Sequence, residues 1–271
     1  MTAIDIHAVL RNLARKRPVF HSEADFQFAL AWEIREETGL DVRLEFPPRP
    51  GTTMHLDIWL PEVRVAIELK YFKKQLDVEL NGERFALPNQ GAHDIHRYHY
   101  VQDIQRVEAA GGGFAVALTN DPTYWTAGAK AHPIDAAFRL HEGRTLPAGN
   151  KLAWARGCAT GRGRASVVLE HPYQLQWRDY GRPVKAAADS GQFRYLAVEV
   201  SRRGRSSPAP GGQDRPGDHV AGEKPGVPAS PRRVAAASSS GDQSPDSTCE
   251  GDFPPSGVRG RLNQRRTPIS S

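Results

Sequence analysis

The stretch from residue 55 to residue 71, HLDIWLPEVRVAIELKY, alternates apolar and polar side chains on both sides of a proline. This alternation is typical of β-strands, because successive strand side chains point to opposite faces of a sheet. Two such runs around a turn predict an antiparallel hairpin. We expect the aliphatic face of the hairpin to be buried, whereas the other face carries Asp57, Glu68 and Lys70.

The length of the hairpin loop decides how close the two carboxylates lie. If Pro61-Glu62 alone forms the loop, Asp57 faces Ala66, and Glu68 is its diagonal neighbour at a Cα separation of about 7–8 Å. Because proline cannot occupy the first position of the primed turns that hairpins prefer, a four-residue loop is the alternative. Both loop lengths are even and keep the three charged side chains on one face.

Two carboxylates and a lysine on one sheet face suit metal-assisted hydrolysis of phosphodiesters. Hard oxygen ligands favour Mg²⁺ or Mn²⁺ over zinc, so Asp57 and Glu68 are candidate metal ligands. Lys70 is a candidate to orient the attacking water or to stabilise charge in the transition state. The alternative is a solvated strand face with a Glu–Lys pair, since such spacings also arise by chance.

Asp57, ten residues and then Glu68-Leu69-Lys70 resemble the signature of the PD-(D/E)XK nuclease superfamily, although Leu56 stands where that superfamily often has proline. The resemblance covers residues 20–120, and the stretches HSEADFQ, ELKY and NQGA resemble a bacterial family within the superfamily that has no assigned substrate. It implies a restriction-endonuclease-like α/β fold with an αβββαβ core and a mixed central sheet. It also implies a metal-dependent nuclease, with DNA as the expected substrate.

The apolar periodicity of the first 125 residues predicts the same order of elements. We expect helices over residues 4–15, 22–38 and 94–110, strands over residues 40–46, in the hairpin and over residues 114–119, and a loop up to residue 88. Ser22 is the expected N-cap of the second helix, and Gly39 is its expected C-terminal stop.

Glu23 lies on the apolar stripe of that second helix, where a carboxylate is costly unless it has a partner. In the PD-(D/E)XK superfamily the helix before the core strands commonly offers an acidic residue to the metal site, and Glu23 matches that position. The alternative is that Glu23 only favours the helix N-terminus through the macrodipole.

Four residues near the predicted site are candidate nucleic-acid contacts. Lys73 and Lys74 follow the hairpin and could bind phosphates, unless they belong to a solvated loop. Gln90 loosely resembles a glutamine that several nuclease families of this fold carry at the entry to the following helix. Arg97 lies within that helix and could equally make an ordinary surface pair.

His93, His96 and His99 lie on this helix or at its entry, with a spacing that could place two of them on one metal ion. A zinc site would need further soft ligands, and none is nearby in the sequence. We therefore expect ordinary, partly exposed helix histidines.

The remaining chain predicts two further regions beyond the core of residues 1–125. Residues 126–200 contain short strand-like runs and are expected to form a β-rich extension packed on the core, where Trp177 and Tyr195 either stack on bases or are buried. Residues 201–271 contain 10 Pro, 10 Gly and 12 Ser, with 11 basic and 7 acidic residues. Such a composition predicts a disordered, basic tail, which is either an inert extension or a non-specific contact for nucleic acid.

The chain has no apolar run near 18 residues and no signal-peptide pattern at its start, so we expect a cytoplasmic protein without a membrane partner. Its two cysteines, Cys158 and Cys249, provide neither a disulfide framework nor a zinc ligand set. The sequence does not indicate an oligomeric state and is compatible with a homodimer.

These patterns lead to one main hypothesis and two alternatives. The main hypothesis is a nuclease in which Asp57 and Glu68 hold Mg²⁺, or Mn²⁺, while Lys70 and Glu23 assist catalysis. The first alternative is a catalytically inactive nucleic-acid-binding module of the same fold. The second is a protein-interaction scaffold, which a lack of positive surface beside the site would favour.

Overall fold

The computed structural model describes residues 4–49, 51, 53–183 and 191–201. The chain divides into a first unit of residues 1–209 and a second of residues 210–271, and all described residues belong to the first. The predicted disordered tail therefore lies outside the described residues from residue 202 onward. Within the described part, no helix combines the length and apolar content that a membrane span requires.

A six-stranded mixed sheet forms the centre of the first unit, so the protein is a mixed α/β protein. The strands occur in the order β1-β2-β3-β6-β12-β11. Their bounds are β1 Arg43–Phe46, β2 Leu56–Leu60, β3 Val65–Phe72, β6 Gly113–Thr119, β11 Trp177–Gly181 and β12 Phe193–Val200. The β3–β6 pair is parallel and the other neighbouring pairs are antiparallel. Because β12 lies next to β6, residues 126–200 contribute directly to the central sheet.

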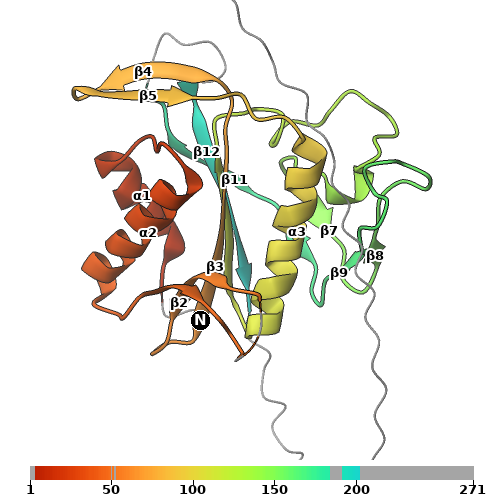
Figure 1. The fold of residues 1–271 in the computed structure, drawn as a ribbon, viewed down its shortest axis with the longest axis horizontal. Helices are drawn as coiled ribbons and strands as arrows, with labels where there is room; N and C mark the ends of the chain where they lie inside the picture. Colours follow the sequence, from red (N-terminus) through yellow and green to blue (C-terminus); the bar gives the residue numbers. More distant parts are fainter. Residues whose placement is uncertain (1–3, 50, 52, 184–190, 202–271) are drawn as a thin grey trace, which may run out of the picture. The chain divides into compact units, whose positions relative to one another are not determined.

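Helices cover both faces of this sheet: α1 (Ile6–Lys16) and α2 (Glu23–Thr38) lie on one face, and α3 (His93–Ala110) lies on the other (Figure 1). The predicted ends of the second helix are confirmed. The Ser22 hydroxyl accepts a hydrogen bond from the backbone N–H of Asp25 at 3.1 Å. Gly39 ends the helix in the left-handed conformation, with φ of 71°, which glycine adopts at little cost.

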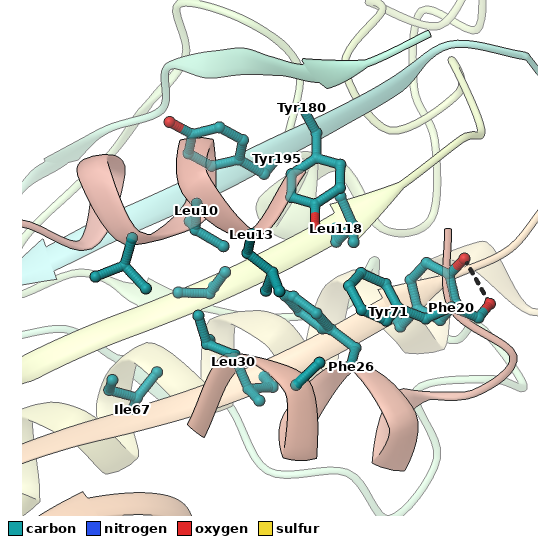
Figure 2. Close-up of a cluster of buried hydrophobic side chains, with 14 of the residues drawn as sticks. Leu10, Leu13, Phe20, Phe26, Leu30, Ile67, Tyr71, Leu118, Tyr180 and Tyr195 are labelled. Atoms are coloured by element: carbon teal, nitrogen blue, oxygen red, sulfur yellow. Dashed lines mark hydrogen bonds between the residues drawn. The ribbon is translucent and has the colours of Figure 1, made fainter. Parts of the chain in front are cut away.

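Two hydrophobic cores hold the layers together. Between the sheet and the α1–α2 pair, Phe20, Phe26 and Leu30 pack around Tyr71 of β3, whose hydroxyl donates to the Phe20 carbonyl at 3.0 Å (Figure 2). The second core lies under α3, where Val101 and Ile104 pack against small residues of β6 and against the strands of residues 145–175. Of the aliphatic face of the predicted hairpin, Ile58, Leu60, Val65, Ile67 and Leu69 are buried in the first core with α1 and α2, whereas Leu56 belongs to the second core.

The hairpin β4 (Leu76–Leu80) and β5 (Glu83–Leu87) occupies the segment for which the sequence analysis predicts a loop, so that prediction is wrong. Its turn, Asn81-Gly82, has positive φ at both residues, as hairpin turns of the primed type require. Short strands follow: β7 Thr145–Leu146, β8 Lys151–Leu152, β9 Val167–Val168 and β10 Tyr173–Gln174, preceded by the 3₁₀ turn η1 Ala136–Phe138.

Trp177 and Tyr195 are 4% and 1% exposed, so both pack in the interior. The hydroxyl of Tyr195 lies 3.1 Å from Nδ1 of His7, and the indole N–H of Trp177 donates to the Leu140 carbonyl at 2.6 Å. The packing alternative is confirmed for both aromatics, and stacking on bases is excluded.

Candidate functional site

The β2–β3 hairpin has a four-residue loop, so the two-residue alternative is wrong. Leu60 pairs with Val65 and Ile58 pairs with Ile67. The backbone N–H of Arg64 donates to the Pro61 carbonyl at 3.3 Å and closes the turn. Proline imposes this longer loop because its fixed φ is incompatible with the first position of a primed turn. Compared with a two-residue loop, β3 is displaced by two residues along β2. Asp57 is therefore level with Glu68 rather than with Ala66.

Asp57 lies where the regular pairing of β2 with β3 ends. Its Oδ2 atom accepts a hydrogen bond from the backbone N–H of Leu69 at 2.6 Å, so the side chain takes the place of a backbone partner. On the other side, the Gln27 amide of α2 donates to the Asp57 carbonyl at 2.8 Å and to Oε1 of Glu45 at 2.9 Å. These contacts hold the Asp57 carboxylate beside β3.

Glu68 projects from β3 toward α3 and is 1% exposed. Its Oε2 atom lies 3.5 Å from the Arg106 guanidinium on α3. Its Oε1 atom is buried and has no hydrogen-bond partner among the residues that the structure describes. An unpartnered carboxylate oxygen in the interior is costly, and sites of this kind are typical of ligand and catalytic positions.

Lys70 follows Glu68 on the same face, and three groups surround its ammonium. Nζ lies 3.1 Å from Oδ2 of Asp103, which is fully buried on α3. It also donates to the Leu69 carbonyl at 2.7 Å and lies 3.8 Å from Oε1 of Glu23. Lys70 therefore connects the N-terminal start of α2 with the middle of α3.

Glu23 is the first residue of α2, and its Oε2 atom accepts a hydrogen bond from the backbone N–H of Tyr71 at 2.8 Å. Although its side chain is 47% exposed, the carboxylate reaches both β3 and Lys70. The structure thus brings together the four predicted catalytic residues, Glu23, Asp57, Glu68 and Lys70.

The carboxylates of this cluster have perturbed pKa values. Burial, and after it the neighbouring charge of Asp57, raise the pKa of Glu68 from 4.5 to about 7 against the opposing effects of Arg106 and Lys70. Burial also raises the pKa of Asp57, and Lys70 and the Leu69 N–H lower it in part. The two carboxylates repel each other in a poorly solvated place, which is a common property of functional sites.

Asp103 and Arg106 belong to the site although they are not among the predicted site residues. The two side chains contact each other on α3, one turn apart. The sequence does carry one signal for Asp103, because it lies between Val101 and Ile104 on the apolar stripe of the helix. A charged residue there requires an ionic partner from the sheet.

Arg97 is wrongly predicted as a nucleic-acid contact, because it is 4% exposed. Its guanidinium lies 2.8 Å from Oδ2 of Asp135, donates to the Thr123 carbonyl at 3.0 Å and stacks over the Tyr124 ring. Arg97 points away from solvent because its guanidinium binds these groups in the interior of the protein.

The other three predicted contacts lie at the end of β3. The Gln90 side chain accepts a hydrogen bond from the Lys73 N–H at 2.8 Å, and the Gln90 N–H donates to the Lys73 carbonyl at 3.0 Å. The Asn120 amide binds the Lys74 backbone in the same way, with distances of 2.8 and 3.0 Å. The ammonium of Lys73 lies over the Tyr71 ring, 5.8 Å from its centroid. Gln90 therefore fixes the backbone that follows Lys70, while both lysine side chains are partly exposed.

The histidines of α3 make separate contacts. Nε2 of His93 lies 2.8 Å from the Asp121 carboxylate, and Nδ1 of His96 lies 3.0 Å from the Tyr124 hydroxyl. In the described part of the chain, no group of three or more His, Cys, Asp and Glu side chains is placed to hold a metal ion.

Comparisons of the sequence with protein-family models, with curated proteins and with solved structures found no match.

Proposed function

We propose that this protein is a metal-dependent nuclease of the restriction-endonuclease-like class and that DNA is its substrate. The observation that carries the proposal is the Glu68 carboxylate, which is buried on the central sheet beside Asp57 with its Oε1 atom unpartnered. A protein gains nothing in stability from two repelling carboxylates in such a place. A bound cation would relieve the repulsion between the two carboxylates and would provide a partner for Oε1 of Glu68.

The order of elements supports the same class. Helix α2, strands β1 to β3, helix α3 and strand β6 occur in the αβββαβ order, with the β4–β5 hairpin inserted between β3 and α3 and with β3 and β6 paired in parallel. Asp57, Glu68 and Lys70 lie on adjacent strands of that core. Strands β2 and β3 form the site, and it is bordered by the start of α2 and the middle of α3.

The donor set fits Mg²⁺ or Mn²⁺ better than zinc. Magnesium is commonly bound by one or two carboxylates and completes its shell with water and substrate phosphate oxygens, so two protein ligands are enough. Asp57 and Glu68 would provide these two carboxylates. Such an ion supplies Lewis acidity toward the phosphodiester and lowers the pKa of a bound water.

The remaining residues of the site hold charges in place. Asp103 positions the Lys70 ammonium between the sheet and α3, from where Lys70 can stabilise negative charge that develops on a phosphate. Glu23 holds the start of α2 against β3 by accepting the hydrogen bond of the Tyr71 N–H. Through its contact with Lys70 it also limits the movement of the lysine side chain. Arg106 offsets part of the negative charge of Glu68.

The ion pair between Lys70 and Asp103 favours a second candidate, a catalytically inactive nucleic-acid-binding module of the same fold. In that case the lysine acts as a counter-ion of a buried carboxylate and has no role in chemistry. The two candidates differ in whether the site binds divalent metal and cleaves.

The test is incubation of the purified chain with plasmid, linear duplex, single-stranded DNA and RNA, in Mg²⁺, Mn²⁺ or EDTA. We expect cleavage of DNA in Mg²⁺ or Mn²⁺ and none in EDTA. Cleavage of RNA alone would contradict the substrate. Binding of nucleic acid without cleavage of any substrate in either metal would contradict the nuclease and support the inactive module.

A further inference from the structure

A group of positively charged side chains lies outside the candidate site, in the loop that precedes β9. Residues 153–166 surround a pocket of about 360 Å³ that contains three arginines, Arg156, Arg162 and Arg164. All three side chains are exposed, and none forms a salt bridge with an acidic residue in the described part of the chain. Their charges are therefore available to a ligand.

The sequence concentrates positive charge around this pocket. From residue 143 to residue 169 there are five basic residues and no acidic one, so these 27 residues carry +5, which equals the net charge of the whole chain. An uncompensated group of arginines raises the local concentration of anions and favours phosphate, whose oxygens match the planar guanidinium.

The pocket is held in shape by consecutive turns. The backbone N–H groups of Cys158, Arg162 and Arg164 each donate to a carbonyl three residues earlier, at 3.1 to 3.2 Å. Gly161 packs so closely on Trp154 that an added Cβ would lie 2.5 Å from the Cβ of Trp154. The ring of Trp154 in turn packs against Tyr98 of α3, with centroids 5.6 Å apart. The arginines therefore project from a loop that is fastened to α3.

The same helix connects the pocket with the candidate site. The Tyr98 hydroxyl donates to the Ala165 carbonyl at 3.0 Å, beside Arg164. Asp103, the partner of Lys70, lies five residues further along α3, a rise of about 7.5 Å. His99 lies between Tyr98 and Asp103 on α3. Burial and the positive charges of Lys70 and Arg164 lower the pKa of His99, so both charged groups interact electrostatically with this histidine.

We propose that the pocket of residues 153–166 binds a phosphate of the nucleic-acid backbone through Arg156, Arg162 and Arg164 and thereby aligns the strand with the site at β3. The alignment role rests on the proposed function, whereas the binding role does not require cleavage. A backbone phosphate needs no particular base, so the pocket contributes affinity without sequence preference.

The test measures binding in EDTA by fluorescence anisotropy with labelled duplex and single-stranded DNA, at salt concentrations from about 50 to about 200 mM. The full-length chain is compared with the triple variant Arg156→Gln, Arg162→Gln and Arg164→Gln. The matched control replaces three exposed arginines on α1 and β11, Arg11→Gln, Arg15→Gln and Arg178→Gln, with the same loss of net charge. Circular dichroism melting verifies that the variants are folded.

We expect the pocket variant to bind about tenfold or more weakly, with a slope of log affinity against log salt reduced by about 2 to 3. The control should remain within about twofold of the wild type. Equal affinities of the two triple variants, or no binding by the wild-type chain, would overturn the proposal. Arginine-dependent binding combined with no cleavage in Mg²⁺ would support the pocket while contradicting the nuclease, so the two failures are distinguishable.

Discussion

Nζ of Lys70 lies 3.1 Å from Oδ2 of Asp103, so an ion pair joins strand β3 to helix α3 at the candidate site. Asp103 is fully buried, and Lys70 has only 18% of its side chain exposed. The pair is thus costly to form and costly to break by removing one partner. Lys70 consequently has a structural role beside any role in catalysis, and experiments on this residue must separate the two.

Lys70→Ala is predicted to lower the rate of DNA cleavage by about 10²–10³, because the variant loses a charge contact with the transition state. It should also lower the free energy of unfolding by about 3 kcal/mol, since the buried Asp103 loses one of its two cationic partners and keeps only Arg106. The double variant Lys70→Ala with Asp103→Asn also removes the charge of Asp103 and should recover part of the stability without recovering cleavage. Cleavage within about threefold of wild type by either folded variant would remove Lys70 from the chemistry.

The pKa of Glu68, raised from 4.5 to about 7, predicts a pH-dependent stability. In this pH range the folded protein retains a proton that the unfolded chain releases, so stability falls as pH rises. Between about pH 5 and about pH 8, the wild type should lose about 2–3 kcal/mol more than Glu68→Gln, which has no proton to release. Urea denaturation across this range measures the difference. Parallel curves for the two proteins would show that Glu68 titrates normally.

Arg97→Ala should destabilise the protein by about 3 kcal/mol, because Asp135 is only 3% exposed at its side chain and would keep only Arg139 as an ionic partner. The affinity of the folded variant for nucleic acid should be unchanged. Arg84→Ala is the control, since Arg84 and Asp77 form a solvent-exposed pair whose loss should leave the stability almost unchanged. A reduced affinity of folded Arg97→Ala would restore this arginine as a nucleic-acid contact.

Gly113 begins β6 at φ of 144°, and an added Cβ would lie 1.8 Å from the Ala66 carbonyl oxygen. Gly113→Ala must therefore displace β6 from β3, and we expect a loss of about 3 kcal/mol or more. Gly91→Ala is the control, because nothing lies within 4 Å of its added Cβ and its φ is not positive. It should stay within about 0.5 kcal/mol of wild type in urea denaturation. Equal effects of the two substitutions would contradict the close contact at Ala66.

The sequence predicts elements whose signals are local. Ser22 and Gly39 mark the ends of α2, and the alternation from residue 55 to residue 71 marks the β2–β3 hairpin. The β4–β5 hairpin carries an equally local signal, because Asn81-Gly82 separates two alternating runs, and the loop prediction for this segment misses it. The sequence around Pro61 is compatible with a two-residue and a four-residue loop. The pairing of Leu60 with Val65 in the structure distinguishes between them.

Pairs that form between layers are less accessible to sequence analysis. The contact of Lys70 with Asp103 and the burial of Arg97 against Asp135 depend on how α3 is rotated about its axis and on a segment 38 residues further along the chain. The sequence does show that a charged residue, Asp103, lies on the apolar stripe of α3. This position indicates that the residue has an ionic partner but does not identify the partner.

The central claim, that Asp57 and Glu68 hold a divalent cation, is tested most directly by calorimetric titration of Mg²⁺ into the wild type and into Asp57→Asn. Asp77→Asn, on the exposed β4–β5 hairpin, serves as the control. We predict one saturable site in the wild type and in the control, and affinity weakened by at least about tenfold in Asp57→Asn. Equal Mg²⁺ binding by wild type and Asp57→Asn, or no saturable binding by the wild type, would contradict the account.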